Sequence, residues 1–452
     1  MGKPPTVRRG KKGSEDQGAG VSRRTLFHRA AGAATGIVVA GCATNKATSV
    51  APASSQTSSS KMAFGIPGSY PGRVVEVHDE RTVRDGQIDQ VAARAMLAKA
   101  MQDLVGTDST AAWKRLFSPG DRVGLKVNCV GHPVNDPKKH AVYTSHEMIR
   151  EVVAALRSIG VTSILLFDRY RTEFAKSQYP ELAKELSIPW DVAAISWDES
   201  QIDYQGYSKG DPSAEERNGK TRTDGSPSVS GYDPDQFVFV DFVHPVHNPD
   251  DPRTRRSHLL NIVTKKVDKI INLCLVKDHA AAGVTGALKN LSHGLVDNVC
   301  RSHSRSELNQ TATFIPAILS HPIIRQKAVL NIMEGFLGLY NGGPWASPFL
   351  FQPKSLFVST DPVAIDRISM EVIDVRRAED GLPPLLKSGK VASKGDDEGH
   401  LFRGTTHVKL AGASGLGVYH KSAEELRGWL GHDPAKLGRD GRVIEHIRSE
   451  MS

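Results

Sequence analysis

The sequence predicts an α/β fold in which helices flank a mostly parallel sheet. Short runs of β-branched residues alternate with segments of helical periodicity, a pattern that is typical of parallel strands covered by helices. Hydrophobic residues make up 39% and charged residues 24% of the 452-residue chain, which argues against an integral membrane protein, a coiled coil or a disordered chain. A chain of this length usually forms two or three domains, and it also fits one large α/β unit.

Seven short apolar runs have the length and the β-branched content of strands. In chain order they are residues 73–77, 122–127, 163–167, 236–242, 269–276, 328–333 and 355–359. Helical periodicity is found in seven further segments. These are residues 87–104, 145–159, 175–186, 284–291, 307–319, 362–375 and 423–430. The segment 145–159 is the clearest, because Met148, Val152 and Ala155 recur at helical spacing and Gly160 supplies a stop.

Residues 198–235 interrupt the alternation of strands and helices. They are polar and rich in Gly, Ser, Asp and Tyr, and they show no sustained apolar period. This composition favours a disordered insertion, and a lid that covers a site is the alternative. The α/β domain would then run from 71 to 398 with this insertion inside it, and a small C-terminal extension would occupy 399–452.

The first 42 residues have the features of an export signal. Arg23 and Arg24 precede an uncharged stretch, 30–40, which is too short to span a bilayer. The segment resembles a signal that is read by the twin-arginine translocation machinery. We therefore expect an exported protein of the periplasm or the cell envelope.

Residues 39–42 resemble a bacterial lipoprotein cleavage box that ends in Cys42. In that interpretation Cys42 is lipidated and anchors the mature chain to the membrane. In the alternative, ordinary cleavage nearby removes Cys42. Residues 43–70 are rich in Ser, Thr and Ala and have no apolar period, so we expect them to form a flexible tether.

The formal charge of +8 is concentrated in this leader. Residues 1–42 hold eight of the 58 basic side chains and only two of the 50 acidic ones, so the rest of the chain is nearly neutral. Binding of nucleic acid by the mature protein thereby loses its main electrostatic support, and we expect no nucleic-acid partner.

The cysteines exclude one class of cofactor. Apart from Cys42 the chain contains Cys129, Cys274 and Cys300, and no two of them form a CxxC pair. A four-cysteine zinc or iron–sulfur site cannot be built from them, so no iron–sulfur cluster is expected. Three buried apolar thiols are favoured over one disulfide with a single thiol left.

Polar residues lie at or just after the ends of several predicted strands. They are Lys126, Asn128, Asp168, Lys277, His279, Glu334 and Asp361. In an open parallel sheet, ligands bind at the edge formed by the carboxyl ends of the strands. We therefore expect these side chains to converge on one cleft.

Residues 277–290 are the most informative segment, because small residues lead from a predicted strand into a predicted helix. Thr285 is placed to cap that helix, and free N–H groups at the helix start would favour an anion. Lys289 inclines back toward the helix start and would add a positive charge to a bound phosphate or carboxylate. The alternative is that Lys289 pairs with a surface carboxylate. The expected ligand-binding residues are Lys126, Asn128, Thr285, Lys289 and Asn290.

A divalent metal is a rival hypothesis for the same edge of the sheet. His279, Asp168 and Glu334 would be its ligands, because neutral imidazole and carboxylate suit zinc, iron or manganese. His244 and His247, three residues apart in a Pro-rich loop, are alternative ligands. Either of them could pair with His279, His293 or an Asp. In the simpler interpretation these loop histidines are ordinary polar residues that bind no metal. The set of metal ligands stays open.

These motifs together resemble the bacterial and archaeal family known as domain of unknown function 362. The resemblance extends from about Val74 to Val375 and depends on residues 123–128, 275–290 and 359–366. The middle block is specific by itself, and the other two are specific only in combination with it.

Two further positions bear on this resemblance. Residues 341–344 match a Gly-Pro turn of the family, and Glu334 stands where many members have Asp, which keeps a carboxylate but alters its reach. Some relatives carry ferredoxin-like cysteine clusters that this chain lacks, so the resemblance implies no iron–sulfur cofactor. It implies no activity either.

The leading expectation is a cell-envelope enzyme that acts on an anionic small molecule by hydrolysis or group transfer. Lys126, Lys277 and Lys289 would hold the anion, and His279 would act as acid, base or metal ligand. The carboxylate partner would be Asp168, Glu334 or Asp361. The catalytic residues would be His279, Lys277 and Asp361. The alternative is a tethered protein that captures a metal or a metabolite without reaction.

Overall fold

The computed structural model describes residues 65–196, 229–244, 247–303, 310–385, 405–430 and 441–452. The chain divides into two units, 1–60 and 61–452, and every described residue belongs to the second. The predicted leader with Cys42, most of the predicted tether and most of the predicted insertion lie outside the described residues. In the part of the chain that is described, no helix is long and apolar enough to cross a membrane.

The second unit is built around a ten-stranded sheet whose main path has the order β14-β1-β13-β11-β9-β4-β5-β6. Its strands are β1 (Arg73–His78), β4 (Arg122–Lys126), β5 (Ser163–Tyr170), β6 (Trp190–Ala194), β9 (Lys269–His279), β10 (Gly283–Val284), β11 (Ala328–Leu339), β12 (Leu350–Phe351), β13 (Ser355–Ser359) and β14 (Glu445–Glu450). The five strands from β11 to β6 are mutually parallel, whereas β13 runs antiparallel to both of its neighbours. The expected α/β fold with a mostly parallel sheet is confirmed.

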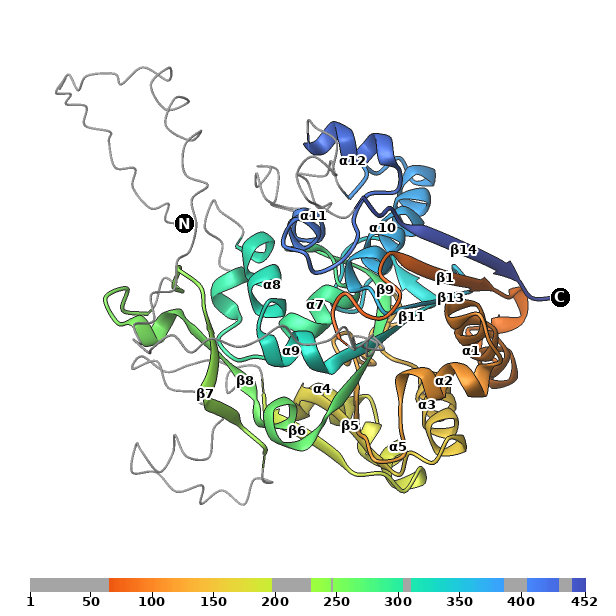
Figure 1. The fold of residues 1–452 in the computed structure, drawn as a ribbon, viewed down its shortest axis with the longest axis horizontal. Helices are drawn as coiled ribbons and strands as arrows, with labels where there is room; N and C mark the ends of the chain where they lie inside the picture. Colours follow the sequence, from red (N-terminus) through yellow and green to blue (C-terminus); the bar gives the residue numbers. More distant parts are fainter. Residues whose placement is uncertain (1–64, 197–228, 245–246, 304–309, 386–404, 431–440) are drawn as a thin grey trace, which may run out of the picture. The chain divides into compact units, whose positions relative to one another are not determined.

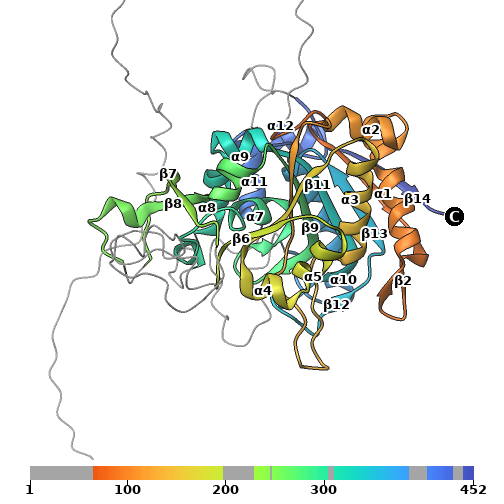
Figure 2. The same cartoon turned by 90° about the horizontal axis from the view of Figure 1, so that it is seen from below.

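Helices cover both faces of this sheet (Figure 1). One face carries α1 (Gln90–Val105), α2 (Ser109–Leu116), α3 (His146–Ser158), α4 (Arg171–Lys176) and α5 (Tyr179–Glu185). The other carries α7 (Gly286–Ser292), α8 (Thr311–Leu319), α9 (Pro322–Lys327), α10 (Pro362–Glu379) and α11 (Thr406–Ala413). Figure 2 shows α1 and α3 on one side of β9 and β11, and α7 and α8 on the other. A separate cluster of buried apolar side chains fills the space on each face.

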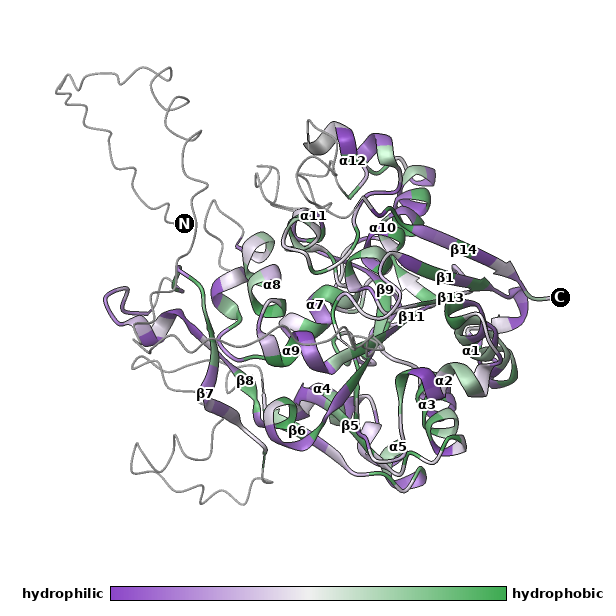
Figure 3. Cartoon of the chain, viewed as in Figure 1, coloured by the Kyte–Doolittle hydropathy of each residue, from purple (hydrophilic) through white to green (hydrophobic). Residues whose placement is uncertain are grey.

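Local sequence signals explain most of these elements. The Ser145 side chain accepts a hydrogen bond from the Met148 N–H at the start of α3, and Gly160 adopts a φ of +88° after its end. The central strands β9 and β11 are largely hydrophobic, and the edge strand β14 is largely hydrophilic (Figure 3). Charged side chains on an edge strand hinder pairing with another chain.

Three differences from the sequence prediction concern the borders of elements. The run expected at 236–242 is β7 (Tyr232–Phe239), which pairs antiparallel with β8 (Arg256–Leu260) in a separate two-stranded sheet, so the end of the predicted insertion is a strand. The single helix expected at 175–186 is two helices, α4 and α5. The predicted C-terminal extension contributes α12 (Ala423–Leu430) and the strand β14, which joins the main sheet beside β1.

The three cysteines of the described unit carry free thiols. Cys129 and Cys274 are buried, and Cys300 is half-buried. The interpretation as three thiols is therefore confirmed, and the alternative with one disulfide is wrong.

Candidate functional site

A cavity of about 720 Å³ lies at the carboxyl ends of β4, β5 and β9. Its walls include Lys126, Asp168, Arg169, His279, Lys289 and Trp345, and we call it the strand-end cavity. The chain adds β5 and β6 on one side of β4 and places β9 and β11 on the other. The cavity thus lies where the strand order reverses, which is the usual ligand site of open α/β sheets.

Lys126 and Asp168 form a buried ion pair in the wall of the cavity. The Lys126 side chain is 1% exposed, and its Nζ lies 2.8 Å from Asp168 Oδ1. The same Nζ donates to the Val127 carbonyl at 2.6 Å and to Asn290 Oδ1 at 3.1 Å. Because an ammonium group has three donors, this amine is fully engaged within the protein. Lys126 therefore shapes the cavity and contributes little uncompensated charge.

Lys277 lies behind the wall of the cavity. Its side chain is fully buried and its Nζ donates to the carbonyls of Val130 at 2.6 Å and Val142 at 2.9 Å, and to Asn128 Oδ1 at 3.3 Å. Burial lowers the pKa of Lys277 to about 7. All three donors are used to hold the loop after β4 against β9, and Lys277 does not line the cavity that we expected it to enter.

Lys289 on α7 has a different environment. Its side chain is half-buried in the wall of the cavity, and its Nζ makes no hydrogen bond or ion pair with any residue that the structure describes. Burial, followed by the nearby charges of Arg169, Lys277 and Lys126, lowers the pKa of Lys289 to about 7. The amine therefore titrates near neutral pH and carries a charge that no described carboxylate offsets.

The start of α7 is already occupied by a carboxylate of the protein. Asp366 on α10 accepts hydrogen bonds from the Ala287 N–H at 2.5 Å and the Leu288 N–H at 3.0 Å. Gly286 has a φ of +48°, and a Cβ atom there would lie 2.2 Å from Asp366 Oδ1, so only glycine permits this approach. The Thr285 side chain lines the cavity but does not cap the helix. The expectation that these N–H groups bind a ligand anion is therefore wrong.

The hydrogen bonds of His279 determine which ring nitrogen carries the proton. Its Nδ1 accepts from the N–H groups of Ala281 at 3.0 Å and Ala282 at 3.1 Å. Because backbone N–H groups only donate, the lone pair lies on Nδ1 and the proton on Nε2. Burial, and then the charge of Lys289, hold the pKa of His279 well below its usual range. His279 is thus a neutral hydrogen-bond donor, not a proton acceptor.

Two further histidines lie in the cavity wall: His293, which the sequence offered as an alternative metal ligand, and His303, which it did not single out. The His293 and His303 rings lie 4.8 Å apart between centroids, and His303 lies 5.5 Å from His279. His293 Nε2 contacts Ser302 Oγ at 2.8 Å, and His303 Nδ1 donates to the Val299 carbonyl at 3.2 Å. Burial lowers the pKa of His303 to about 3. The cluster is therefore neutral near pH 7.

The three residues predicted as metal ligands do not share one site, because Asp168 and His279 line the strand-end cavity and Glu334 does not. Glu334 lies inside β11, where it accepts from the Ser145 N–H at 3.1 Å, and burial raises the pKa of Glu334 to about 8. Asp168 is engaged by Lys126, and the proton on His279 Nε2 opposes coordination there. Over the described ranges, no group of three or more His, Cys, Asp and Glu side chains is placed to hold a metal ion. His244 and His247 do not line the cavity.

Asp361 does not line the cavity either. It follows β13, and because β13 is antiparallel to β11, its carboxyl end lies at the opposite edge of the sheet. Its carboxylate caps α10 by accepting from the N–H groups of Val363 and Ala364, both at 2.9 Å, and it also accepts from Gly72 and Val418. Burial raises the pKa of Asp361 to about 6. The structure therefore places Asp361 away from the strand-end cavity, with its carboxylate engaged by main-chain N–H groups.

A chain of asparagines connects the cavity to the core, and sequence reasoning missed two of its members, Asn272 and Asn331. Asn331 in β11 accepts from Asn272 in β9 at 2.9 Å, and Asn272 in turn accepts from Asn290 in α7 at 2.8 Å. Asn290 Oδ1 accepts from Lys126, and Asn128 Nδ2 lies 3.4 Å from it. These buried hydrogen bonds fix the side chains around Lys126. The signal that could have revealed Asn272 and Asn331 is an amide within an otherwise apolar strand.

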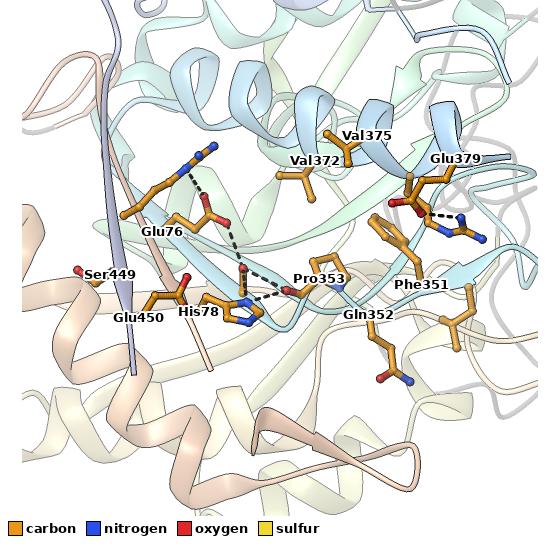
Figure 4. Close-up of a pocket in the computed structure, with 14 residues that line it drawn as sticks. Glu76, His78, Phe351, Gln352, Pro353, Val372, Val375, Glu379, Ser449 and Glu450 are labelled. Carbon is orange, nitrogen blue, oxygen red and sulfur yellow. Dashed lines mark hydrogen bonds and ion pairs between the residues drawn. The ribbon is translucent and has the colours of Figure 1, made fainter. Parts of the chain in front are cut away.

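A second hollow of about 650 Å³ lies beside β1, β12, β13 and α10 (Figure 4). Its walls include Glu76, His78, Phe351, Val372, Arg376 and Arg448, and we call it the edge cavity. Two ion pairs lie in its wall, because Glu76 lies 3.2 Å from Arg448, and Arg376 lies 2.7 Å from Glu379. The carboxylate of Glu450 also lines the edge cavity, but this residue is exposed, so the described residues of the edge cavity offer a ligand no buried uncompensated charge.

One family model, described as Domain of unknown function (DUF362), matches residues 229–371, roughly a third of the chain. The resemblance that the motifs suggested between Val74 and Val375 is thus confirmed over this narrower range. The match includes His279 and Lys289 and excludes Lys126, which precedes it. Among curated proteins and among solved structures, none matches the chain.

Proposed function

We propose that the strand-end cavity binds an anionic small molecule and that Lys289 is its principal charged contact. The observation that carries this proposal is the balance of charge in the cavity wall. Of the described residues that line it, Asp168 is the one carboxylate, and Lys126 already neutralises it at 2.8 Å. The charge of Lys289 therefore remains, and a bound phosphate or carboxylate would offset it.

The chemistry that fits these residues is hydrolysis or group transfer on that anion. With a pKa of about 7, the protonated Lys289 that contacts the anion can give its proton to the leaving oxygen as that bond breaks, while the attacking water or hydroxyl releases its proton to solvent. The His279 Nε2–H can donate a hydrogen bond to an oxygen on which negative charge develops. In this scheme Lys126, Asn128 and Asn290 keep the wall rigid.

Binding without reaction is the second candidate. It is favoured by the hydrogen bonds of His279 and His293, which engage ring nitrogens with backbone N–H groups and serine hydroxyls. Lys289 is then the main group near the cavity that exchanges a proton at neutral pH. A protein of this kind would capture an anionic metabolite, or a metal carried by one, for a partner.

The test is native mass spectrometry with elemental analysis on the full chain purified from its own cell envelope. We expect a small anion to be retained by the natural protein and lost from Lys289→Met. Lys114→Met, an exposed position on α2, removes the same charge and should retain the anion. If the retained molecule returns chemically altered after incubation, the enzyme is supported over the binding protein. Equal retention by the Lys289→Met variant would contradict both.

The location of the protein is a separate proposal that depends on the leader. Arg23 and Arg24 would direct export through the twin-arginine machinery, and Cys42 would carry the lipid anchor. Cell fractionation tests both steps. Replacing both arginines by lysine should retain the chain in the cytoplasm, and Cys42→Ala should release it from the membrane fraction. Unchanged fractionation of either variant would contradict the corresponding step.

A further inference from the structure

Trp345 is an exposed aromatic side chain in the wall of the strand-end cavity. Its side chain is 52% exposed, which is unusual for a large hydrophobic residue of this chain. Of the described residues that line the cavity, Val130, Ala280, Ala281 and Pro344 add further apolar surface. The cavity thus combines an apolar, aromatic part with the cationic part around Lys289.

The loop that carries Trp345 is held firmly on both sides. Before it, the Gly343 N–H donates to Asp278 Oδ1 at 2.9 Å, and the Gly343 carbonyl accepts from the Ala280 N–H at 3.0 Å. A Cβ atom at position 343 would lie 2.3 Å from the Asp278 carbonyl oxygen, so this close approach requires glycine. After it, Ser347 exchanges two backbone hydrogen bonds with His140, at 2.8 and 3.0 Å. The indole is therefore presented by a fixed backbone.

The volume of the cavity gives an independent indication. About 720 Å³ lies within the range of roughly 300–1,000 Å³ that is typical of sites for drug-sized organic molecules. A lone inorganic anion would leave most of this space, including the surface of Trp345, without contact. A ligand with a second part besides its charged group would fill this space and contact Trp345.

We infer that the ligand is an aromatic anion, whose phosphate or carboxylate contacts Lys289 while its ring stacks on Trp345. This inference rests on the proposed function and adds the substrate class. Stacked aromatic rings gain free energy beyond the burial of their area, which a saturated ring of the same size does not. Trp345 is in this interpretation a specificity-determining residue.

The experiment compares three probes by isothermal titration calorimetry of the full chain: inorganic phosphate, phenyl phosphate and cyclohexyl phosphate. We expect phenyl phosphate to bind about tenfold more tightly than inorganic phosphate, and severalfold more tightly than cyclohexyl phosphate. Trp345→Ala should remove this advantage and change the affinity for inorganic phosphate less than about twofold. Trp345→Phe should restore part of it.

A matched control is available on β7. Phe239 is 53% exposed and does not line the cavity, so Phe239→Ala should bind all three probes as the natural chain does. Equal affinities for phenyl and cyclohexyl phosphate, or an equal loss for all three probes in Trp345→Ala, would overturn the inference.

The Lys289→Met variant separates the proposed function from this inference. Suppose that the natural chain binds the three probes without an aromatic preference and that Lys289→Met binds none of them. The proposed function then stands, and only the inference fails. If phosphate binds to Lys289→Met unchanged, the proposed function itself fails.

Discussion

The strand-end cavity and the edge cavity have similar volumes, about 720 and 650 Å³, but they differ in how their charges are held. In the first, the Lys126–Asp168 pair is at most 6% exposed, and Lys289 has no acidic partner among the described residues. In the second, Arg376 and Glu379 pair at side-chain exposures of 31% and 61%, so water already solvates both. A hollow of a given size is thus a better candidate for a ligand site where buried charge is left uncompensated.

The largest difference should be seen when one ion pair in each cavity is broken. Asp168→Asn leaves the buried ammonium of Lys126 without a counter-charge, and such a loss costs about 3–5 kcal/mol of the free energy of unfolding. Glu379→Gln in the edge cavity should leave stability nearly unchanged, because the pair is exposed. Urea unfolding followed by circular dichroism measures both variants.

The double variant Lys126→Met with Asp168→Asn is the control, because it removes the stranded charge together with its partner. It should recover a large part of the lost stability. If Asp168→Asn and Glu379→Gln lower the midpoint equally, the distinction between the two cavities is not supported.

The second effect is the pH dependence of anion binding. Sulfate is a suitable probe, because its charge is constant between pH 6 and pH 9. Only the protonated amine of Lys289 should bind it, so its affinity should be constant below pH 7 and fall about tenfold per pH unit well above it. Calorimetric titration of Lys289→Arg, whose guanidinium stays charged, should give a flat profile. If the affinity of the natural chain for sulfate does not change with pH, arginines such as those of the edge cavity bind the sulfate instead of Lys289.

The smallest effect is on stability and has the opposite sign to the effect on binding. Because the pKa of Lys289 falls from 10.5 to about 7 on folding, its protonated form destabilises the folded state fully below pH 7, and this cost disappears as the pH rises toward 10.5. The Lys289→Met substitution should therefore raise the free energy of unfolding by about 1 kcal/mol at pH 6. At pH 9.5 it should raise this free energy by less. Urea unfolding at the two pH values checks this, with Lys114→Met as the control. A destabilised Lys289→Met variant at pH 6 would contradict the description of an unpaired charge.

Periodicity and strand ends were sufficient to predict the α/β fold and the convergence of Lys126, His279 and Lys289 on one cavity. They could not predict the direction of β13, because an apolar run of five residues is the same in a parallel and an antiparallel pair. For that reason Asp361 was expected at the wrong edge. The Lys277 amine donates to main-chain carbonyls of the loop after β4 and not to a ligand. No local sequence pattern specifies the path of that loop, so this contact could not be predicted.

Other features could have been found in the sequence. Arg169 directly follows Asp168 at the same strand end, and Trp345 follows the Gly-Pro turn. The amides Asn272 and Asn331 interrupt apolar strands, and a buried amide requires a partner. The contact of Asp366 with α7 could not have been found in the sequence, because it joins residues almost eighty positions apart.

That contact of Asp366 has a consequence for how this fold can change its ligand over evolutionary time. Where a loop's main chain recognises an anion, point mutations leave the recognising atoms in place and selectivity shifts slowly. Here the helix amides are taken by an internal carboxylate, and side chains such as Lys289 and Trp345 are left to make the contacts. Single codon substitutions at those positions can therefore retune selectivity while the Asp366–Gly286 junction preserves the scaffold, so homologous chains should diverge in ligand sooner than in architecture.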